Sequence, residues 1–442
     1  MTSFQVRTAP AQQDAGADVL LDWFGDSKAS STVQYGGDFL KGLRPSPVAR
    51  DLLRLGGAVF CVDKVAKRSE TADGWTRELE LVVPVSDVRL WEAARDHVHR
   101  ALDFLSGDHW QVSFVDDSDA AEPAERTDGA AAVSLFSGGL DSLSGVIDLL
   151  ETGHDLLLVG HHDSSLTDNR QRDLFAELQA HYGPDRVALR RLLLRPAAAS
   201  ASQARPLPAQ DEGENTMRSR SFLFFAAGIA VADGIGARVP LYVPENGFIG
   251  INVPLTASRA GSLSTRTTHP LYMHRMAALL EQVGLDHRLE NPYRLLTKGE
   301  ALAQNANRNL LVSLAPRSVS CSHPETARWR KRPQGNCGYC YPCLIRRASM
   351  HHIGQDRVAE YAWDALTDTD LLQRDWNSGA SLRSLAQSLS QPERPVDVMR
   401  NGRIPGGETH QFFEVYRRGR EELRAWFASG AGPELRRRLG MA

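Results

Sequence analysis

The 442 residues lack long apolar runs, a strong net charge and a spread of cysteine pairs, and each absence excludes a class of protein. The longest apolar stretch, Phe222 to Ala232, is about half of the ~20 residues that a membrane-spanning helix needs. Fifty-one basic and 54 acidic side chains leave a formal charge of −3, which argues against a polybasic nucleic-acid binder. Five cysteines are too few for a disulfide-rich secreted domain. We therefore expect a cytoplasmic protein that does not bind membranes, and nucleic acid is not its expected partner.

The N-terminal part of the chain predicts a domain of mixed secondary structure over residues 1–128. Thr76–Val85 alternates like a strand, Val88–Leu105 has apolar residues at helical spacing, and His109–Asp117 again alternates. We interpret this region as an α+β domain. It ends in an acidic linker between Asp116 and Asp128, where Ala, Pro and Gly accompany the carboxylates.

Residues 129–355 alternate short apolar strands with helices, a pattern typical of an α/β fold with a parallel sheet covered on both faces. The expected strands are Ala131–Phe136, Asp155–Gly160, Val187–Leu194 and Val239–Gly247. A nearly all-apolar helix over 220–236 is expected at the centre. The loop from Pro196 to Thr216 is either a lid over a site or a passive insertion. Ligands of such folds bind at the carboxyl ends of the strands.

The remaining residues, 356–442, are expected to form a helical extension. Its last long helix is predicted to begin at Thr409 and to carry a broad apolar stripe. The stripe consists of Phe412, Phe413, Tyr416, Leu423 and Trp426. Because such stripes are usually buried, we expect this helix to pack against the main domain.

A glycine-containing turn, Ser137-Gly138-Gly139-Leu140-Asp141-Ser142, lies between an expected strand and an expected helix. Glycines let backbone N–H groups approach an anion, and the helix N-terminus favours negative charge. The Ser137 and Ser142 hydroxyls can donate to phosphate oxygens, whereas Asp141 among phosphates needs Mg²⁺ or a nucleotide group to oppose its charge. The chain has no GxxxxGK[ST] motif, so a Walker-type site is excluded. The alternative is a turn that only caps a helix.

Four of the five cysteines fall within 23 residues, at Cys321, Cys337, Cys340 and Cys343. Four thiolates at this spacing suit a tetrahedral Zn²⁺ ion and leave no open coordination position, so the predicted site is structural. A redox CxxC pair and an iron–sulfur cluster are the alternatives.

Basic residues greatly outnumber acids around these cysteines. They predict either a positive rim that attracts ATP or an acidic macromolecule, or an ordinary solvated surface. The basic residues are Arg317, Arg328, Arg330, Lys331, Arg332, Arg346 and Arg347, against the single acid Glu325.

The turn at 137–142 resembles the PP-loop of the adenine-nucleotide α-hydrolases, which cleave ATP between the α- and β-phosphates and activate a substrate as an adenylate. The resemblance implies a parallel-sheet ATP pyrophosphatase domain. It also implies catalytic roles for Ser137, Asp141 and Ser142. The implied ATP-binding residues are Phe136, Ser137, Gly138, Gly139, Leu140, Asp141 and Ser142.

Together with the cysteine motif, this loop resembles the 7-cyano-7-deazaguanine synthases over about Ala131 to Met350. The segments Thr216–Ala230 and Asn291–Leu302 are similar to an Arg-containing helix and a Thr/Ser-Lys-x-Glu stretch of that family. In the family, ATP activates the carboxylate of 7-carboxy-7-deazaguanine, ammonia forms the amide, and a second ATP dehydrates it to the nitrile. The enlarged form resembles synthase-like proteins encoded in bacterial anti-phage gene clusters.

Four further residues are candidates for substrate binding. Glu245 and Asn246 suit the edge of a guanine-like base, although Asn-Gly is also common at a turn. Arg218 and Arg220 can hold a carboxylate or an α-phosphate, or can form ordinary ion pairs on a helix face. The surrounding segment, Pro244 to Thr256, departs from the family's usual substrate segment.

The sequence thus predicts an ATP- and Mg²⁺-dependent, zinc-containing ligase that forms a carbon–nitrogen bond. It would adenylate a 7-deazaguanine carboxylate and pass it to ammonia, giving the amide or 7-cyano-7-deazaguanine. Alternatively, it would pass it to a protein amine of a partner from a defence operon. The rival interpretations are a tRNA-modifying PP-loop enzyme, either a thiolase or a lysine-adding ligase, and a non-catalytic nucleotide-binding defence subunit.

Overall fold

A computed structural model gives the fold of the chain. It describes residues 2–8, 16–23, 33–35, 38–117, 132–162, 165–196, 214, 216, 218–254, 266–326, 328, 334–368, 371 and 379–439. The acidic linker and most of the loop between Pro196 and Thr216 lie outside the described residues. Within the described part, no helix is both long and apolar enough to cross a membrane.

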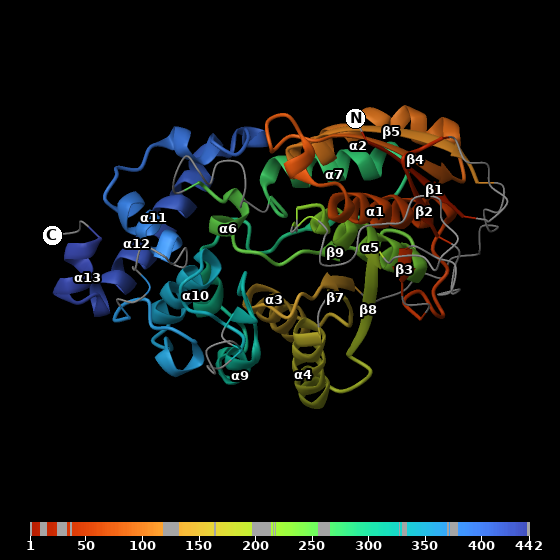
Figure 1. Ribbon diagram of the computed structural model, residues 1–442. Helices are drawn as coiled ribbons and strands as arrows, with labels where there is room; N and C mark the ends of the chain where they lie inside the picture. The colour runs from red at the N-terminus through yellow and green to blue at the C-terminus, as the bar shows by residue number, and fades with distance from the viewer. Residues whose placement is uncertain are drawn as a thin grey trace.

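The central element is a six-stranded sheet with the order β10-β9-β6-β7-β8-β3 (Figure 1). Its strands are β3 (Val33–Tyr35), β6 (Ala132–Leu135), β7 (Leu156–His162), β8 (Val187–Pro196), β9 (Leu241–Tyr242) and β10 (Leu289–Glu290). Five strands run parallel, and β3 pairs antiparallel with β8 at the edge. The predicted α/β architecture is confirmed.

Helices cover both faces of this sheet. Successive residues of a strand point to opposite faces, and here both sets are apolar, so both faces are buried under helices. Val133 and Leu135 of β6 join the apolar cluster around α5, whereas Ala132 joins the cluster around α3 and α4. The helices of this part are α3 (Leu140–Glu151), α4 (Ser165–Tyr182), α5 (Arg220–Ile235), α6 (Gly247–Ile251), α7 (Pro270–Gln282), α8 (Lys298–Ala303) and α9 (Arg308–Leu314). Helix α5 is buried from Ser221 to Asp233, in agreement with its nearly all-apolar sequence.

The fourth expected strand, Val239–Gly247, is much shorter in the structure. Only Leu241 and Tyr242 form β9, because Pro240 and Pro244 lack the N–H group that extends a strand. After β9 the chain turns into α6. The side chain of Asn246 caps this short helix by accepting from the Ile249 amide at 3.0 Å.

The N-terminal unit contains a second sheet with the order β2-β1-β4-β5. Its elements are β1 (Thr2–Arg7), β2 (Val19–Asp22), α1 (Pro47–Val65), β4 (Glu78–Val85), α2 (Val88–Ser106) and β5 (His109–Asp116). The helix and the two strands predicted around it are confirmed. The α+β interpretation is wrong, because all the described strand pairs of this sheet are parallel. Parallel neighbours need a crossover, and α2 provides it between β4 and β5.

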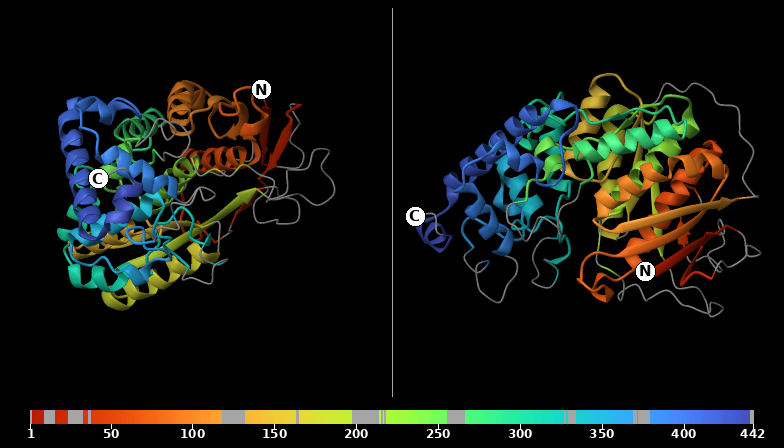
Figure 2. Two further views of the ribbon diagram at one scale, coloured as in Figure 1. Left: turned by 60° about the vertical axis from the view of Figure 1, so that its left-hand side comes forward. Right: turned by 90° about the horizontal axis from the view of Figure 1, so that it is seen from above.

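This N-terminal unit shares one apolar core with the central domain. Helix α1 packs along α5, and α2 packs along α7, so both lie between the two sheets. Figure 2 shows this unit, in red and orange, against the central helices. The two segments on either side of the predicted boundary at the acidic linker therefore share one hydrophobic core.

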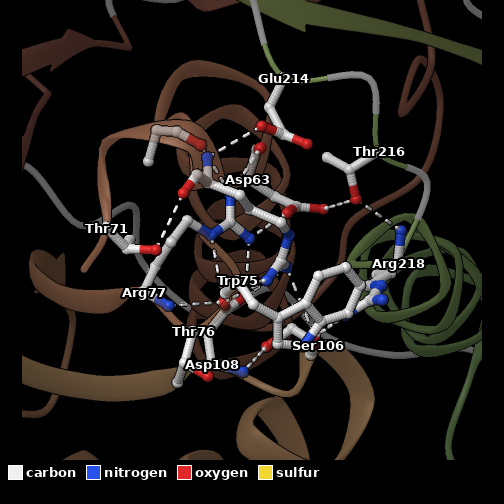
Figure 3. A network of polar contacts seen from close by, with 12 residues as sticks. Asp63, Thr71, Trp75, Thr76, Arg77, Ser106, Asp108, Glu214, Thr216 and Arg218 are labelled. Atoms are coloured by element: carbon white, nitrogen blue, oxygen red, sulfur yellow. Dashed lines mark hydrogen bonds and ion pairs between the residues drawn. The ribbon is translucent and has the colours of Figure 1, made fainter. Parts of the chain in front are cut away.

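Buried charges join the same two parts (Figure 3). The guanidinium of Arg77 contacts Asp63 at 2.5 Å and Asp108 at 2.6 Å, and Arg68 contacts Asp108 at 2.8 Å. Asp63 also accepts from the hydroxyl of Ser219 at 2.6 Å and from its amide at 3.1 Å. Because Ser219 directly precedes α5, this network attaches the N-terminal unit to the start of the central helix.

The described residues of the C-terminal extension, 356–442, are helical, as predicted. They form α11 (Ala380–Leu389), α12 (Thr409–Gly430) and α13 (Pro433–Arg438), and they follow α10 (Tyr341–His352), the last helix of the 129–355 part. Short 3-10 turns occur at Arg68–Glu70, Ala315–Arg317, Val358–Glu360, Pro395–Met399 and Pro405–Gly407. Helix α12 begins at Thr409, and its stripe packs in an apolar cluster with α10, α11 and three of the four cysteines of the motif.

Candidate nucleotide and metal site

The turn from Phe136 to Ser142 joins the carboxyl end of β6 to α3, as the sequence predicts. Phe136 and Leu140 are fully buried and anchor the turn on both sides. Gly138 has a φ of +80°, a left-handed conformation that favours glycine. A Cβ at this position would also lie 3.3 Å from the Gln171 side chain. Both observations explain the first glycine of the motif.

Two hydroxyls meet in this turn. The Ser137 and Ser142 oxygens lie 3.2 Å apart. The Ser137 oxygen accepts from the Gly139 amide at 3.3 Å, and Ser142 donates to the Gly139 carbonyl at 3.0 Å. Hydroxyls beside the first amides of a helix are well placed to bind an anion. Ser137 is exposed and Ser142 is buried, so the pair lies at the surface end of the turn.

Asp141 is held by two partners from distant parts of the chain. The Lys298 ammonium lies 2.9 Å from one carboxylate oxygen, and the Asn246 amide donates to the other at 3.2 Å. The structure thus brings Asn246, a candidate from the sequence, to the loop. The Lys298 ammonium thus opposes the negative charge of Asp141.

Lys298 is the site residue that the sequence analysis did not single out. Its side chain is only 4% exposed, and lysines are almost never buried without a partner. It is the first residue of α8, whose N-cap is Thr297. The signal that could have found it was the Asn291–Leu302 stretch, where a lysine follows a helix-capping threonine in a chain with few lysines.

Glu245 adds a second carboxyl group near the first. Its side chain accepts from the Thr268 hydroxyl, and its backbone carbonyl accepts from the Asn291 amide at 2.8 Å. Burial raises the pKa of Glu245 to about 7, and the negative charge of Asp141 adds to this effect. Two nearby carboxylates are suitable ligands for a divalent cation, which would oppose both charges.

Close backbone contacts fix these residues against α3. A Cβ at Gly145 would lie 2.3 Å from Pro244, and a Cβ at Gly247 would lie 2.1 Å from the Arg294 carbonyl oxygen. Both positions therefore require glycine. The absence of a side chain at Gly145 lets Pro244, which precedes Glu245 and Asn246, pack directly against α3.

Arg220 lies at the neighbouring strand end. Its guanidinium donates to the His161 carbonyl at 3.0 Å and contacts the His161 ring nitrogen at 3.2 Å. Gln171 donates to the same carbonyl and to the Ser137 carbonyl, each at 3.3 Å. Arg220 is thus connected to the turn through the Gln171 side chain, and its predicted role in binding a carboxylate or phosphate stays a prediction.

Arg218 lies elsewhere, although it is only two residues away. Its guanidinium stacks over Trp75 at 4.5 Å and donates to the Ser106 carbonyl at 2.5 Å, within the buried network of the N-terminal unit. Burial lowers the pKa of Arg218 to about 10, and the Arg68 charge contributes. The structure therefore gives Arg218 a place in the interface between units, and these contacts do not support a substrate-binding role.

The four predicted cysteine ligands come together. The sulfur atoms of Cys321, Cys337, Cys340 and Cys343 all lie within 4.8 Å of one another, and none forms a disulfide. Backbone amides of Cys337 and Cys340 donate to cluster sulfurs at 3.3 Å, as expected around thiolate ligands. This group can bind a metal ion such as zinc. The fifth cysteine, Cys61, lies outside this group and is fully buried in α1.

The cysteine loop, which begins at Val319, contacts the turn from Phe136 to Ser142 directly. The hydroxyl of Ser320, the residue before Cys321, accepts from the Leu140 amide at 3.2 Å. The Val319 amide donates to the Gly138 carbonyl at 3.0 Å. A metal bound by Cys321 would therefore hold a segment that contacts the first turn of α3.

Two members of the expected basic rim are buried. Arg346 donates to Ser318 and to the Ala315 carbonyl, and Arg347 pairs with Asp356 at 3.0 Å and with Asp364 at 2.5 Å. Arg346 and Arg347 follow Cys343 by three and four positions and lie on the inner face of α10. Their guanidinium groups therefore bond within the fold and do not face solvent. Arg330, Lys331 and Arg332 lie outside the described residues.

A scan against protein-family models and a search of curated proteins each found no match to this chain.

Proposed function

We propose that this chain is an ATP-dependent ligase of the PP-loop type. The observation that carries the proposal is the combination at one strand end of two serine hydroxyls, a helix N-terminus and the Asp141–Lys298 pair. The turn suits the pyrophosphate part of ATP, because its hydroxyls and helix amides donate hydrogen bonds to anions. Asp141 would hold Mg²⁺, which neutralises phosphate charge when bound.

The proposed reaction begins with a carboxylate oxygen attacking the α-phosphorus of ATP. The bond between the α-phosphorus and the bridging oxygen breaks, pyrophosphate leaves, and an acyl-adenylate forms. A nitrogen nucleophile then attacks the acyl carbon, AMP leaves, and the nitrogen loses a proton. Ser137 and Ser142 would bind the leaving pyrophosphate, and Lys298 would stabilise its negative charge.

The proposed carboxylate is that of 7-carboxy-7-deazaguanine. Glu245 and Asn246 support this choice, because a carboxylate accepts hydrogen bonds from N1–H and the exocyclic amine of a guanine-like base. Asn246 already contacts Asp141, so a base bound here would lie next to the phosphate-binding turn. The four cysteines would hold zinc as a structural ion that supports this side of the site.

The acceptor is either ammonia or a protein amine. Ammonia gives a primary amide, which a second ATP can activate at oxygen so that it loses water and becomes a nitrile. A protein amine gives a substituted amide, which cannot form a nitrile, so one ATP suffices. The parts outside 129–355 support the second acceptor, because ammonia needs no docking surface. They also support a role with a partner in anti-phage defence.

Sulfur transfer to tRNA has less support. It normally requires a reactive cysteine near the loop. Four cysteines lie in the cluster, and the fifth, Cys61, is fully buried in α1. A non-catalytic nucleotide-binding subunit would keep the same turn but would release no pyrophosphate.

Pyrophosphate release tests the proposal. Purified protein with ATP, Mg²⁺ and 7-carboxy-7-deazaguanine is expected to release pyrophosphate, and Asp141→Asn is expected to reduce the rate by about 100-fold or more, as loss of a key electrostatic group does. The control is Asp155→Asn, an exposed carboxylate that pairs with Arg186. No release by the unaltered protein, or an unchanged rate in Asp141→Asn, contradicts the proposal.

The acceptor is distinguished in the same system. With ammonia, two ATP per nitrile are expected. With a protein acceptor, one ATP is consumed per adduct, and intact-mass spectrometry of co-expressed neighbouring gene products should show a deazaguanine-sized increase.

A further inference from the structure

The buried lysine of the site is supported from the C-terminal extension. Thr297 and Gly299 flank Lys298 at the start of α8, and both are bound by Glu422 of α12. The Thr297 hydroxyl donates to one Glu422 oxygen, and the Gly299 amide donates to the other at 3.2 Å. One carboxylate thus binds the residues on both sides of Lys298, through the Thr297 side chain and the Gly299 backbone.

The fit between these two helices is close. A Cβ at Gly299 would lie 2.5 Å from the Glu422 carboxylate, so a larger residue here would displace that carboxylate. Nearby, Arg418 of α12 pairs with Glu300 at 2.6 Å and donates to the Leu295 carbonyl at 3.0 Å. Thr297 and Glu300 also form a reciprocal capping box, which fixes the first turn of α8.

We propose that Glu422 is a positioning residue of the phosphate-binding site. It keeps the first turn of α8 in place, so that the Lys298 ammonium stays beside Asp141. This role rests on the proposed function where it concerns ATP, and it gives the C-terminal extension a part in nucleotide binding. Glu422 would act on the site through Lys298, because its two oxygens bind Thr297 and Gly299, the residues on either side of that lysine.

The geometry suits this role better than simple helix packing would. A buried carboxylate is costly unless its oxygens are well bonded, and apolar side chains would join α12 to α8 at lower cost. The bonds of Glu422 go specifically to the two residues next to the lysine. Loss of these bonds would leave Lys298 attached mainly by its own ion pair with Asp141.

Lysine acylation tests the positioning without ATP. The chain has six lysines, so peptide mass spectrometry can follow each one. Lys298 is 4% exposed and Lys41 is 76% exposed, so Lys41 is the internal reference. In Glu422→Ala, the acylation rate of Lys298 relative to Lys41 is expected to rise about tenfold or more, as loss of a charged hydrogen bond predicts. The matched control is Glu421→Ala, which removes an exposed neighbour paired with Arg417.

A kinetic measurement separates positioning from general destabilisation. In Glu422→Ala the KM for ATP is expected to rise about tenfold, while the KM for the carboxylate substrate stays unchanged. A variant that merely lowers the folded fraction would reduce kcat and leave both KM values unchanged. If Glu422→Ala fails to fold, Glu422→Gln keeps the shape but retains one acceptor oxygen, and an intermediate change in both measurements is expected.

The outcomes for the two proposals are distinct. Unchanged acylation of Lys298 in both Glu422 variants overturns the positioning role, whatever the ATP measurements show. Increased acylation in a protein whose unaltered form releases no pyrophosphate supports the positioning of Lys298 and overturns the ligase proposal.

Discussion

The N-terminal unit and the C-terminal extension are attached to the central domain in different ways. The N-terminal unit shares the apolar core around α5 and is joined by a buried ionic network at Asp63, Arg77 and Asp108. The C-terminal extension packs around the cysteine loop, and α12 reaches the first turn of α8 through Glu422. The ionic network of the N-terminal unit binds Ser219 of the central domain, whereas Glu422 of the C-terminal extension binds the residues next to Lys298.

This difference separates stability from site geometry. The ionic network supports the central helix on the side where Arg218 lies, and none of its contacts among the described residues reaches the turn from Phe136 to Ser142. The cysteine loop and α12 touch that turn or its lysine through Ser320 and Glu422. Disturbing one attachment should therefore have consequences unlike those of disturbing the other.

The largest effect is expected from the metal. Cys340→Ser should abolish tight zinc binding and reduce stability strongly, because a structural zinc site contributes roughly 10–16 kcal/mol in small peptides. Elemental analysis should find one zinc per chain before the change. Hydrogen exchange should then increase in α10 and α12, and α1 should remain protected.

Cys61→Ala is the matched control, because it removes a buried thiol outside the cluster and should keep the zinc. Equal loss of hydrogen-exchange protection in α1 and α12 would contradict the difference between the two attachments, since the N-terminal unit and the C-terminal extension would then unfold together. A stable, fully active protein without metal would contradict the structural role of the ion.

A smaller effect is expected from the ionic network. Asp108→Ala leaves Arg68 buried without its carboxylate partner and Arg77 with Asp63 alone, and should lower the free energy of unfolding by about 3–5 kcal/mol. The KM for ATP should not change, because the ionic network does not reach the turn from Phe136 to Ser142.

Urea unfolding and ATP kinetics together test this expectation. The control is Asp96→Ala, whose pair with Arg100 is largely exposed, so its effect should stay within about 0.5 kcal/mol. A raised KM for ATP in folded Asp108→Ala would contradict the separation between stability and site geometry.

The smallest effect concerns Glu245, which lies in the site itself. Its pKa is raised to about 7 in the folded protein, above the usual 4.5. Between these values the folded state holds a proton that the unfolded state has lost. Stability should therefore fall as the pH rises from 4.5 to 7, by at most about 1.4 kcal/mol per pH unit, and stay level above pH 7.

Glu245→Gln should remove this dependence, so the variant should gain stability relative to the unaltered protein as the pH rises. Urea unfolding at several pH values measures the difference. Glu281→Gln, an exposed position on α7, should show no such trend. A constant difference between Glu245→Gln and the unaltered protein would contradict the raised pKa.

Local patterns predicted the parts of the fold that depend on neighbouring residues. The strand before the turn, the turn itself and α3 follow from an apolar run, two glycines and a second apolar run. The four cysteines also assemble as expected, because their short spacing restricts them to one loop. Asn246 and Arg220 lie beside the turn, since both follow or precede elements of the same sheet.

Long-range contacts account for what the sequence did not predict. The pairing of Lys298 with Asp141 joins residues 157 positions apart, and no local pattern specifies it. The contact of Arg218 with Trp75 was not predicted, because Trp75 belongs to another unit. The parallel arrangement of β1, β2, β4 and β5 was missed for a similar reason, since a strand pattern does not reveal its neighbour.

The packing of α1 against α5 also affects how the chain is made. Arg220, which begins α5, comes 155 positions after Val65, which ends α1. At roughly 5–20 residues per second, a ribosome needs roughly 8–30 s to add that length. During this interval, the side of α1 that α5 later covers remains open to solvent. A chain released from the ribosome in that window would expose this apolar surface and would be prone to aggregate.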